Sequence, residues 1–214
     1  MTDVANDPET LTHTEFDPDA HGITSTGLSN EKLGMWVFLA SECLLFGGLI
    51  STFLLYRGKV VPDENGVVTE LHEVFSIPFT SISSFVLLMS SLTMVLAVSA
   101  IQRGDNRSLR IWLMLTALLG AIFISGQFYE FYEFVAVEGF GLTHSPAWSA
   151  FYVLTGFHGA HVTIGIVMLM TTFGLSLRGR ITQERAEAVE VVGLYWHFVD
   201  IVWIIVFTVV YLIK

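Results

Sequence analysis

The sequence predicts an all-α membrane protein, a polytopic bundle of five transmembrane helices, and three observations carry that prediction. Hydrophobic residues make up 53% of the 214 residues and charged residues only 14%, whereas about 25% charged residues is usual in soluble domains. The apolar residues gather in five blocks that each reach the roughly 20 residues needed to cross a bilayer. No block alternates as a barrel strand does, so helices are expected to satisfy the backbone within the bilayer.

The five expected helices follow one another along the chain. They cover Leu33–Tyr56, Pro78–Ile101, Leu109–Tyr129, Ala147–Leu177 and Val189–Ile213. The fourth is longer than a span requires, so we expect it to be tilted or to extend beyond the bilayer. Between the first two helices, Pro62 and the pair Asn65-Gly66 are typical of a turn.

The chain is divided into an acidic N-terminal tail, residues 1–31, and one membrane domain, residues 32–214. The tail holds seven acids and no Lys or Arg, so we do not expect it to be a secretory signal, which has a basic start. The net charge of -10 and the lack of a basic patch argue against nucleic-acid binding. The single cysteine, Cys43, cannot form an internal disulfide.

Basic residues predict the orientation, because they collect in cytoplasmic loops. One side would carry Lys32, Arg103, Arg107, Arg110, Arg178, Arg180 and Arg185, and the other Arg57, Lys59 and Lys214. We therefore expect the N-terminus in the cytoplasm and the C-terminus outside.

Five ionisable side chains fall inside the expected helices: Glu42, His158, His161, His197 and Asp200. Such groups are costly in a membrane and usually functional. With a helical rise of 1.5 Å per residue they lie about 12–25 Å from the cytoplasmic ends of their helices, so we expect them to meet near the midplane.

Two further carboxylates, Glu130 and Glu133, lie near the outer end of the third helix. We expect both at the membrane interface. Glu130 has a depth similar to that of Arg57, which makes an ion pair between them plausible.

Each residue of the membrane cluster has a structural and a functional interpretation. Glu42 is either a carboxyl hydrogen-bonded within the bundle or a group that contacts lipid or lies on a proton pathway. His158 and His161 are either polar contacts between helices or ligands of a haem or metal. Because no Glu-x-x-His motif is present, a di-iron site is not favoured. Asp200 could fix the imidazole of His197, three residues before it.

Small residues four positions apart allow close approach of membrane helices. Gly47 with Ser51, and Gly156 with Ala160, have this spacing. The spacing is common in membrane bundles and weakly specific, so it permits a close contact at these pairs without predicting one.

Four motifs resemble a known family. They are Ser41-Glu-Cys-Leu-Leu-Phe46, Gly126-Gln-Phe-Tyr-Glu-Phe131, Thr155-Gly-Phe-His-Gly-Ala-His161 and Tyr195-Trp-His-Phe-Val-Asp-Ile-Val-Trp203. With them the sequence resembles subunit III of haem-copper terminal oxidases, the cytochrome c and quinol oxidase group, over about residues 33–213. The five-helix form looks like shorter prokaryotic versions, without the two additional N-terminal helices of mitochondrial members.

The resemblance implies an accessory subunit without catalytic or metal-binding residues, in the plasma membrane of a prokaryote. It would pack on subunit I, which carries the haems and copper, in a complex with subunit II and other subunits. There it would support proton uptake and protect the complex during reduction of oxygen. Glu42 falls on the position of the family's carbodiimide-reactive glutamate, and a bound phospholipid is a further implication.

Three other functions stay open at this point. The first is a subunit III-like accessory protein of a nitric oxide reductase. The second is an independent haem or metal oxidoreductase that uses His158, His161 and His197. The third is a small transporter in which Glu42 and Asp200 relay protons. Haem analysis, vesicle uptake and co-purifying proteins distinguish them.

Overall fold

Long helices form the described part of the protein, which in this computed structural model comprises residues 29–58 and 76–213. The α-helices are α1 (Asn30–Tyr56), α3 (Ile77–Gln102), α4 (Asn106–Tyr132), α5 (Pro146–Leu177) and α6 (Ala186–Phe207). Two of them continue as π-helical segments, α4 over Glu133–Val137 and α6 over Thr208–Leu212. All five elements are long and apolar enough to cross a membrane, which confirms the predicted fold class. The expected turn at Pro62 and residues 1–28 of the tail lie outside the described residues.

Three of the five α-helices begin at side chains that accept hydrogen bonds from free backbone N–H groups. Ser29 accepts from the backbone N–H of Lys32, and Asp105 accepts from those of Arg107 and Ser108. Ser145 caps α5, where Pro146 takes a first-turn position that needs no N–H partner. These caps lie outside the apolar blocks, so each helix begins slightly earlier than predicted.

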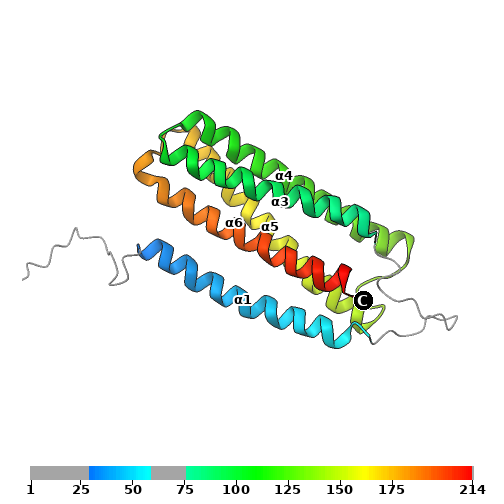
Figure 1. Cartoon of the computed structure of the whole chain (residues 1–214). Coiled ribbons are helices and arrows are strands. Elements are labelled where there is room, and N and C mark those ends of the chain that lie inside the picture. Colours follow the sequence, from blue (N-terminus) through cyan, green and yellow to red (C-terminus); the bar gives the residue numbers. More distant parts are fainter. Residues whose placement is uncertain (1–28, 59–75, 214) are drawn as a thin grey trace, which may run out of the picture.

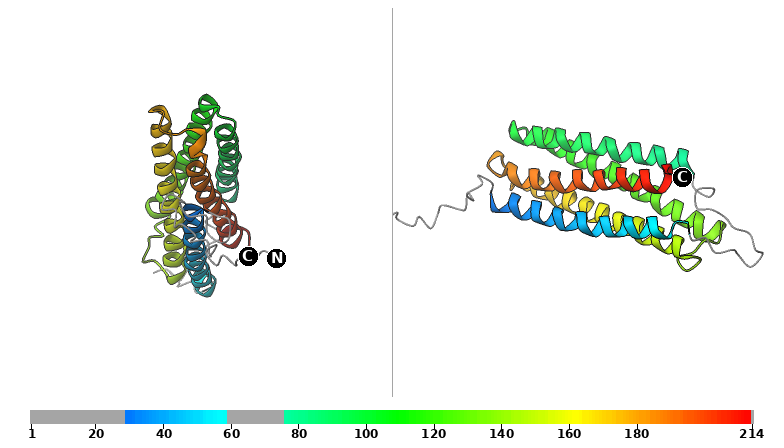
Figure 2. Two further views of the ribbon diagram at one scale, coloured as in Figure 1. Left: turned by 90° about the vertical axis from the view of Figure 1, so that its left-hand side faces the viewer. Right: turned by 60° about the horizontal axis from the view of Figure 1, so that its bottom comes forward.

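Helices α3, α4, α5 and α6 form a four-helix bundle, and α1 packs on the side of it formed by α5 and α6 (Figure 1). The end-on view in Figure 2 shows α1 apart from α3 and α4. Contacts at one end join the start of α1 to the start of α6 and the end of α3. The expected basic side, with Lys32 and the two short connections, is therefore one physical end of the bundle.

Trp196 and Trp203 on α6 fill the centre of the four-helix bundle, and both are 1% exposed. The indole N–H of Trp196 donates to Ser90 Oγ at 2.9 Å, and that of Trp203 donates to Ser84 Oγ at 2.8 Å. Because an indole N–H has no water partner inside a membrane bundle, these two serines of α3 fix both rings.

Close helix packing occurs at two glycines that the sequence analysis did not single out. A Cβ on Gly120 would lie 2.5 Å from Cη2 of Trp196, and one on Gly165 would lie 2.8 Å from Cε3 and Cζ3 of the same ring. By contrast, a Cβ on Gly47 or Gly156 would meet nothing within 4 Å. The close approach that the spacing allows is therefore not used at Gly47 or Gly156 within the described residues.

Candidate functional site: the polar groups of the membrane spans

Glu42 of α1 and His161 of α5 form one bonded pair. Glu42 Oε2 lies 3.1 Å from His161 Nε2, and the two side chains are 15% and 12% exposed. His161 Nδ1 lies 2.8 Å from the backbone oxygen of Phe157, which can only accept, so Nδ1 carries a proton. The proton between Glu42 and Nε2 can then reside on either partner, and the pair is neutral in both states.

The neighbours of this pair hold it in place. Phe46, one turn after Glu42, packs its ring edge against His161 with centroids 5.1 Å apart. The hydroxyl of Tyr195 on α6 donates to the backbone oxygen of His161 at 3.0 Å. Three helices, α1, α5 and α6, therefore meet at the pair.

His158, one turn from His161, does not join it. The ring is fully buried and stacks on Trp203 with a centroid distance of 4.8 Å. Phe123 and Phe46 contact it edge-on at 6.0 and 6.4 Å. Neither ring nitrogen has a hydrogen-bond partner among the described residues. The interpretation of His158 as a polar contact between helices is therefore wrong.

His197 and Asp200 also do not bond to each other. His197 Nδ1 lies 2.6 Å from Ser91 Oγ of α3. Asp200 is 3% exposed, and its carboxylate lies beside the same serine, Ser91, without a hydrogen bond of full geometry to a described residue. The expectation that Asp200 fixes the imidazole of His197 is therefore wrong. Ser91 of α3 makes the hydrogen bond to this ring instead.

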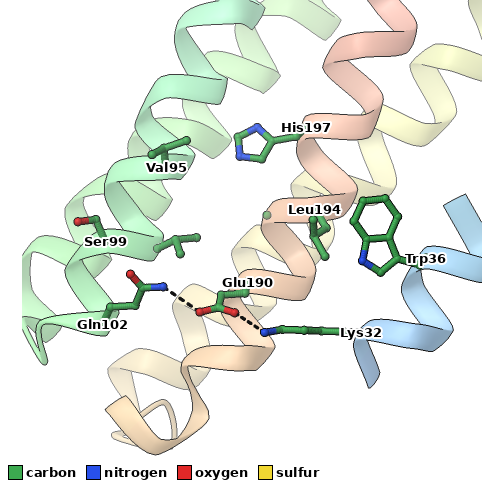
Figure 3. A pocket seen from close by; sticks show the side chains of 10 residues that line it. Lys32, Trp36, Val95, Ser99, Gln102, Glu190, Leu194 and His197 are labelled. Carbon is green, nitrogen blue, oxygen red and sulfur yellow. Dashed lines mark hydrogen bonds and ion pairs between the residues drawn. The ribbon is translucent and has the colours of Figure 1, made fainter. Parts of the chain in front are cut away.

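A pocket of about 460 Å³ opens between α1, α3 and α6, and His197 points into it (Figure 3). At its mouth Lys32 Nζ lies 2.7 Å from Glu190 Oε2, and the amide of Gln102 donates to Glu190 Oε1 at 2.9 Å. Beside it, the hydroxyl of Ser29 donates to Glu187. These bonds tie the start of α1 to the start of α6.

Glu130 accepts three hydrogen bonds near the other end of the bundle. Thr80 donates to Oε1 at 2.8 Å, while Gln127 and Tyr211 donate to Oε2 at 3.2 and 3.1 Å. Glu130 is only 3% exposed.

The expected ion pair of Glu130 with Arg57 is absent among the described residues, because α1 does not pack on α4. Glu133 is half-buried at the start of the π-helical segment.

Sequence reasoning missed Thr80, Gln127 and Tyr211 as partners of Glu130. It also missed the serines that hold His197, Trp196 and Trp203. Serine and threonine are common in membrane helices, so their presence alone carries little signal. The seven-residue spacing of Trp196 and Trp203 places both on one face of α6, and this spacing could have predicted that they pack together.

The described residues do not fit a haem or metal centre. No group of three His, Cys, Asp or Glu side chains in the described ranges is arranged to hold a metal ion. His161 is bonded to Glu42, His197 to Ser91, and His158 is enclosed by aromatic rings.

The family model for cytochrome c oxidase subunit III matches residues 15–214. The chain belongs to the cytochrome c oxidase subunit III family. It is 41% identical over 184 residues to the probable quinol oxidase subunit 3 of Staphylococcus saprophyticus, covering 85% of this chain and 88% of that protein.

Relatives from Bacillus subtilis carry two different names. This family member is 37% identical over 204 residues to the cytochrome c oxidase subunit 3 of that organism, covering 95% of this chain and 96% of the relative. It is 40% identical over 185 residues to the quinol oxidase subunit 3, covering 84% and 85%. Both the predicted family and membership of an oxidase complex are therefore confirmed.

Proposed function

We propose that this chain is the accessory subunit III of a proton-pumping haem-copper oxidase in a prokaryotic plasma membrane. It packs on subunit I within a complex that also holds subunit II, and the haems and copper belong to those partners. The family match over residues 15–214 is the observation that carries the proposal. The absence of a metal-ligating group from the described spans supports a role without redox chemistry.

Within this role, the Glu42–His161 pair supports proton uptake by the complex. A proton can move between Oε2 and Nε2 over 3.1 Å without changing the net charge of the pair. The pair is partly exposed on the side of α1 and α5, where a neighbouring subunit or lipid can reach it. The three-helix junction around it keeps the two atoms in hydrogen-bonding contact.

Purification of the whole complex through a tag on this chain tests the proposal. In mild detergent, we expect haem and copper to co-purify with the chain in a fixed ratio. The purified complex should consume oxygen when a quinol or cytochrome c is supplied as electron donor. Haem that stays with the chain after the partners are removed would contradict the proposal. So would a chain that purifies without redox subunits.

Deletion of the chain tests the supporting role separately. The remaining oxidase is expected to start at a normal rate and to lose activity faster during turnover. An unchanged time course would show that the chain does not protect the complex.

A further inference from the structure

The pocket between α1, α3 and α6 combines apolar walls with polar groups at two levels (Figure 3). The apolar walls come from all three helices: Trp36, Val95, Val98 and Leu194. Gln102 and Glu190 lie at the mouth, whereas His197 follows Glu190 by seven residues, which is about 10 Å of helical rise. A molecule in this space can therefore bond to the protein at two opposite ends.

His197 provides the polar group at the deep end. Its Nδ1 lies 2.6 Å from Ser91 Oγ. No hydrogen bond joins Nε2 to any residue in the ranges 29–58 and 76–213, and the ring points into the pocket (Figure 3). Nε2 is thus the atom of this ring that a bound molecule can reach.

Behind the imidazole, Ser91 links His197 to a buried carboxyl. Asp200 is 3% exposed and lies beside Ser91. When the Ser91 hydroxyl donates to Asp200, Nδ1–H of His197 donates to Ser91 Oγ, and Nε2 is an acceptor. When Asp200 is protonated, the Ser91 hydroxyl can donate to Nδ1 instead, and Nε2 then carries the proton. Nε2 can therefore bond to a hydroxyl or to a carbonyl.

The mouth of the pocket offers a hydrogen-bond donor but no excess of positive charge. Lys32 is paired with Glu190 at 2.7 Å, and Glu187 adds a second acid at the same end of α6. The side-chain amide of Gln102 donates one N–H to Glu190 and has a second one. Because a phosphate would face two carboxylates here, a neutral polar group is better accommodated.

The shape of the pocket favours a flat ring with an apolar tail. Helix α1 packs on α5 and α6 and stands apart from α3 (Figure 2), so the pocket is open sideways toward the bilayer. The ring of Trp36, which is 53% exposed, forms one wall and offers an aromatic face for stacking. A tail attached to a bound ring can leave through the lateral opening into the hydrocarbon.

We propose that this pocket binds a quinone or quinol, a neutral flat ring with an oxygen at each end. His197 Nε2 bonds to one ring oxygen and the free N–H of Gln102 to the other, while the ring lies against Trp36. The rise of about 10 Å between the two levels leaves room for one ring between two hydrogen bonds of about 2.9 Å each. Because Nε2 can donate or accept, the site suits both the carbonyl and the hydroxyl form. The inference does not rest on the accessory role proposed above.

Photo-cross-linking of the full-length protein in detergent tests the site, with an azido-naphthoquinone that carries an alkyl tail as the probe. We expect label on the peptides of α1 around Trp36 and of α6 around His197, and we expect unlabelled menaquinone to displace it. Phosphatidylglycerol at the same concentration should not. Label spread evenly over the spans, or displaced equally well by the phospholipid, would overturn the proposal. Since the label is mapped on this chain, quinol oxidation by other subunits does not affect the result.

Removal of the deep hydrogen bond is the first variant test. His197→Phe keeps a ring and removes Nε2, so the menaquinone concentration that halves the labelling should rise about fivefold, the loss expected for one hydrogen bond. His144→Phe, the same change outside the pocket, is the matched control and should leave that concentration unchanged. An unchanged value in His197→Phe would overturn the proposal.

Pocket filling is the second variant test and leaves His197 in place. Val95 lines the pocket and is 51% exposed, so Val95→Trp adds a large ring to the pocket without overpacking the bundle. Labelling of α6 should fall at least as far as in His197→Phe. Val167→Trp, at a side chain of α5 that is 60% exposed and lies outside this pocket, is the matched control and should label as the wild type does. Labelling that is insensitive to Val95→Trp would place the probe elsewhere and overturn the proposal.

Discussion

Gly165 of α5 lies directly against the indole of Trp196 on α6, where a Cβ would be 2.8 Å from two ring carbons. The indole cannot shift away from Gly165, because its Cη2 and Cζ2 atoms face Gly120 and its N–H is bonded to Ser90. The centre of the bundle is thus shaped around one tryptophan.

Gly165→Ala is therefore expected to lower the free energy of unfolding by about 1–3 kcal/mol, the usual cost of overpacking. The thermal midpoint of the purified protein in detergent is the measurement. Gly48→Ala, at an open position of α1, is the control and should leave the midpoint unchanged or slightly higher. Equal midpoints for Gly165→Ala and the wild type would show that Trp196 can move.

Glu42→Gln should leave assembly with the oxidase intact, because an amide can still donate to His161 Nε2. Glu42→Leu removes the partner and should cost about 1–3 kcal/mol, the penalty for an unsatisfied buried group. The yield of complex on a tagged chain and its thermal midpoint measure both effects. Loss of the complex in Glu42→Gln would show that assembly requires the carboxyl itself.

Tyr211→Phe removes one of the three donors to Glu130 and leaves a buried acceptor with fewer bonds. We expect a destabilisation of about 1–3 kcal/mol, measured by thermal unfolding. Tyr129→Phe on α4, where the hydroxyl has no hydrogen bond to a described residue and the ring is 57% exposed, should have no effect. A similar loss in both variants would argue against a specific role of the Glu130 bond.

Asp105 provides a pH-dependent contribution outside the spans. Hydrogen bonds from the side chain and the backbone of Ser108 lower the pKa of this carboxyl. A group with a lowered folded pKa stabilises the protein above its unfolded pKa of about 3.9 and loses that contribution as pH falls further.

The wild type should therefore be more stable than Asp105→Asn at pH 7, and the difference should disappear as the pH falls through the folded pKa of Asp105. Thermal midpoints measured between pH 7 and pH 3 test this. A difference that does not shrink as the pH is lowered would show that the ionised form of Asp105 is not the stabilising one.

The sequence predicted the spans because long apolar blocks have few alternatives in a bilayer. It missed the extension of α4 to Val137, because Glu130 and Glu133 interrupt the apolar block and suggest a loop. In the structure Glu130 is instead buried and bonded to Tyr211, some 80 residues away in the chain. A carboxylate with distant donors gives no local signal.

Depth estimates predicted that Glu42 and His161 could meet near the midplane, and the structure pairs them. They could not assign His158 or His197, because depth does not fix the direction in which a side chain points around its helix. His158 turns toward Trp203 and His197 toward Ser91. Likewise, the spacing of Gly156 and Ala160 shows that they share a face but not whether another helix of this chain covers it.

The position of α1 has a consequence for biogenesis. This helix emerges first from the ribosome, yet the helices that it packs on, α5 and α6, are synthesised last. The Glu42–His161 bond therefore cannot form until His161 has been synthesised, more than a hundred residues after Glu42. An unpaired carboxyl in hydrocarbon is unfavourable, and the hydrogen bond to His161 offsets that free energy only once α5 is in place. The order of synthesis thus requires α1 to dock on α5 and α6 after both have been made, and the Glu42–His161 bond forms with that docking.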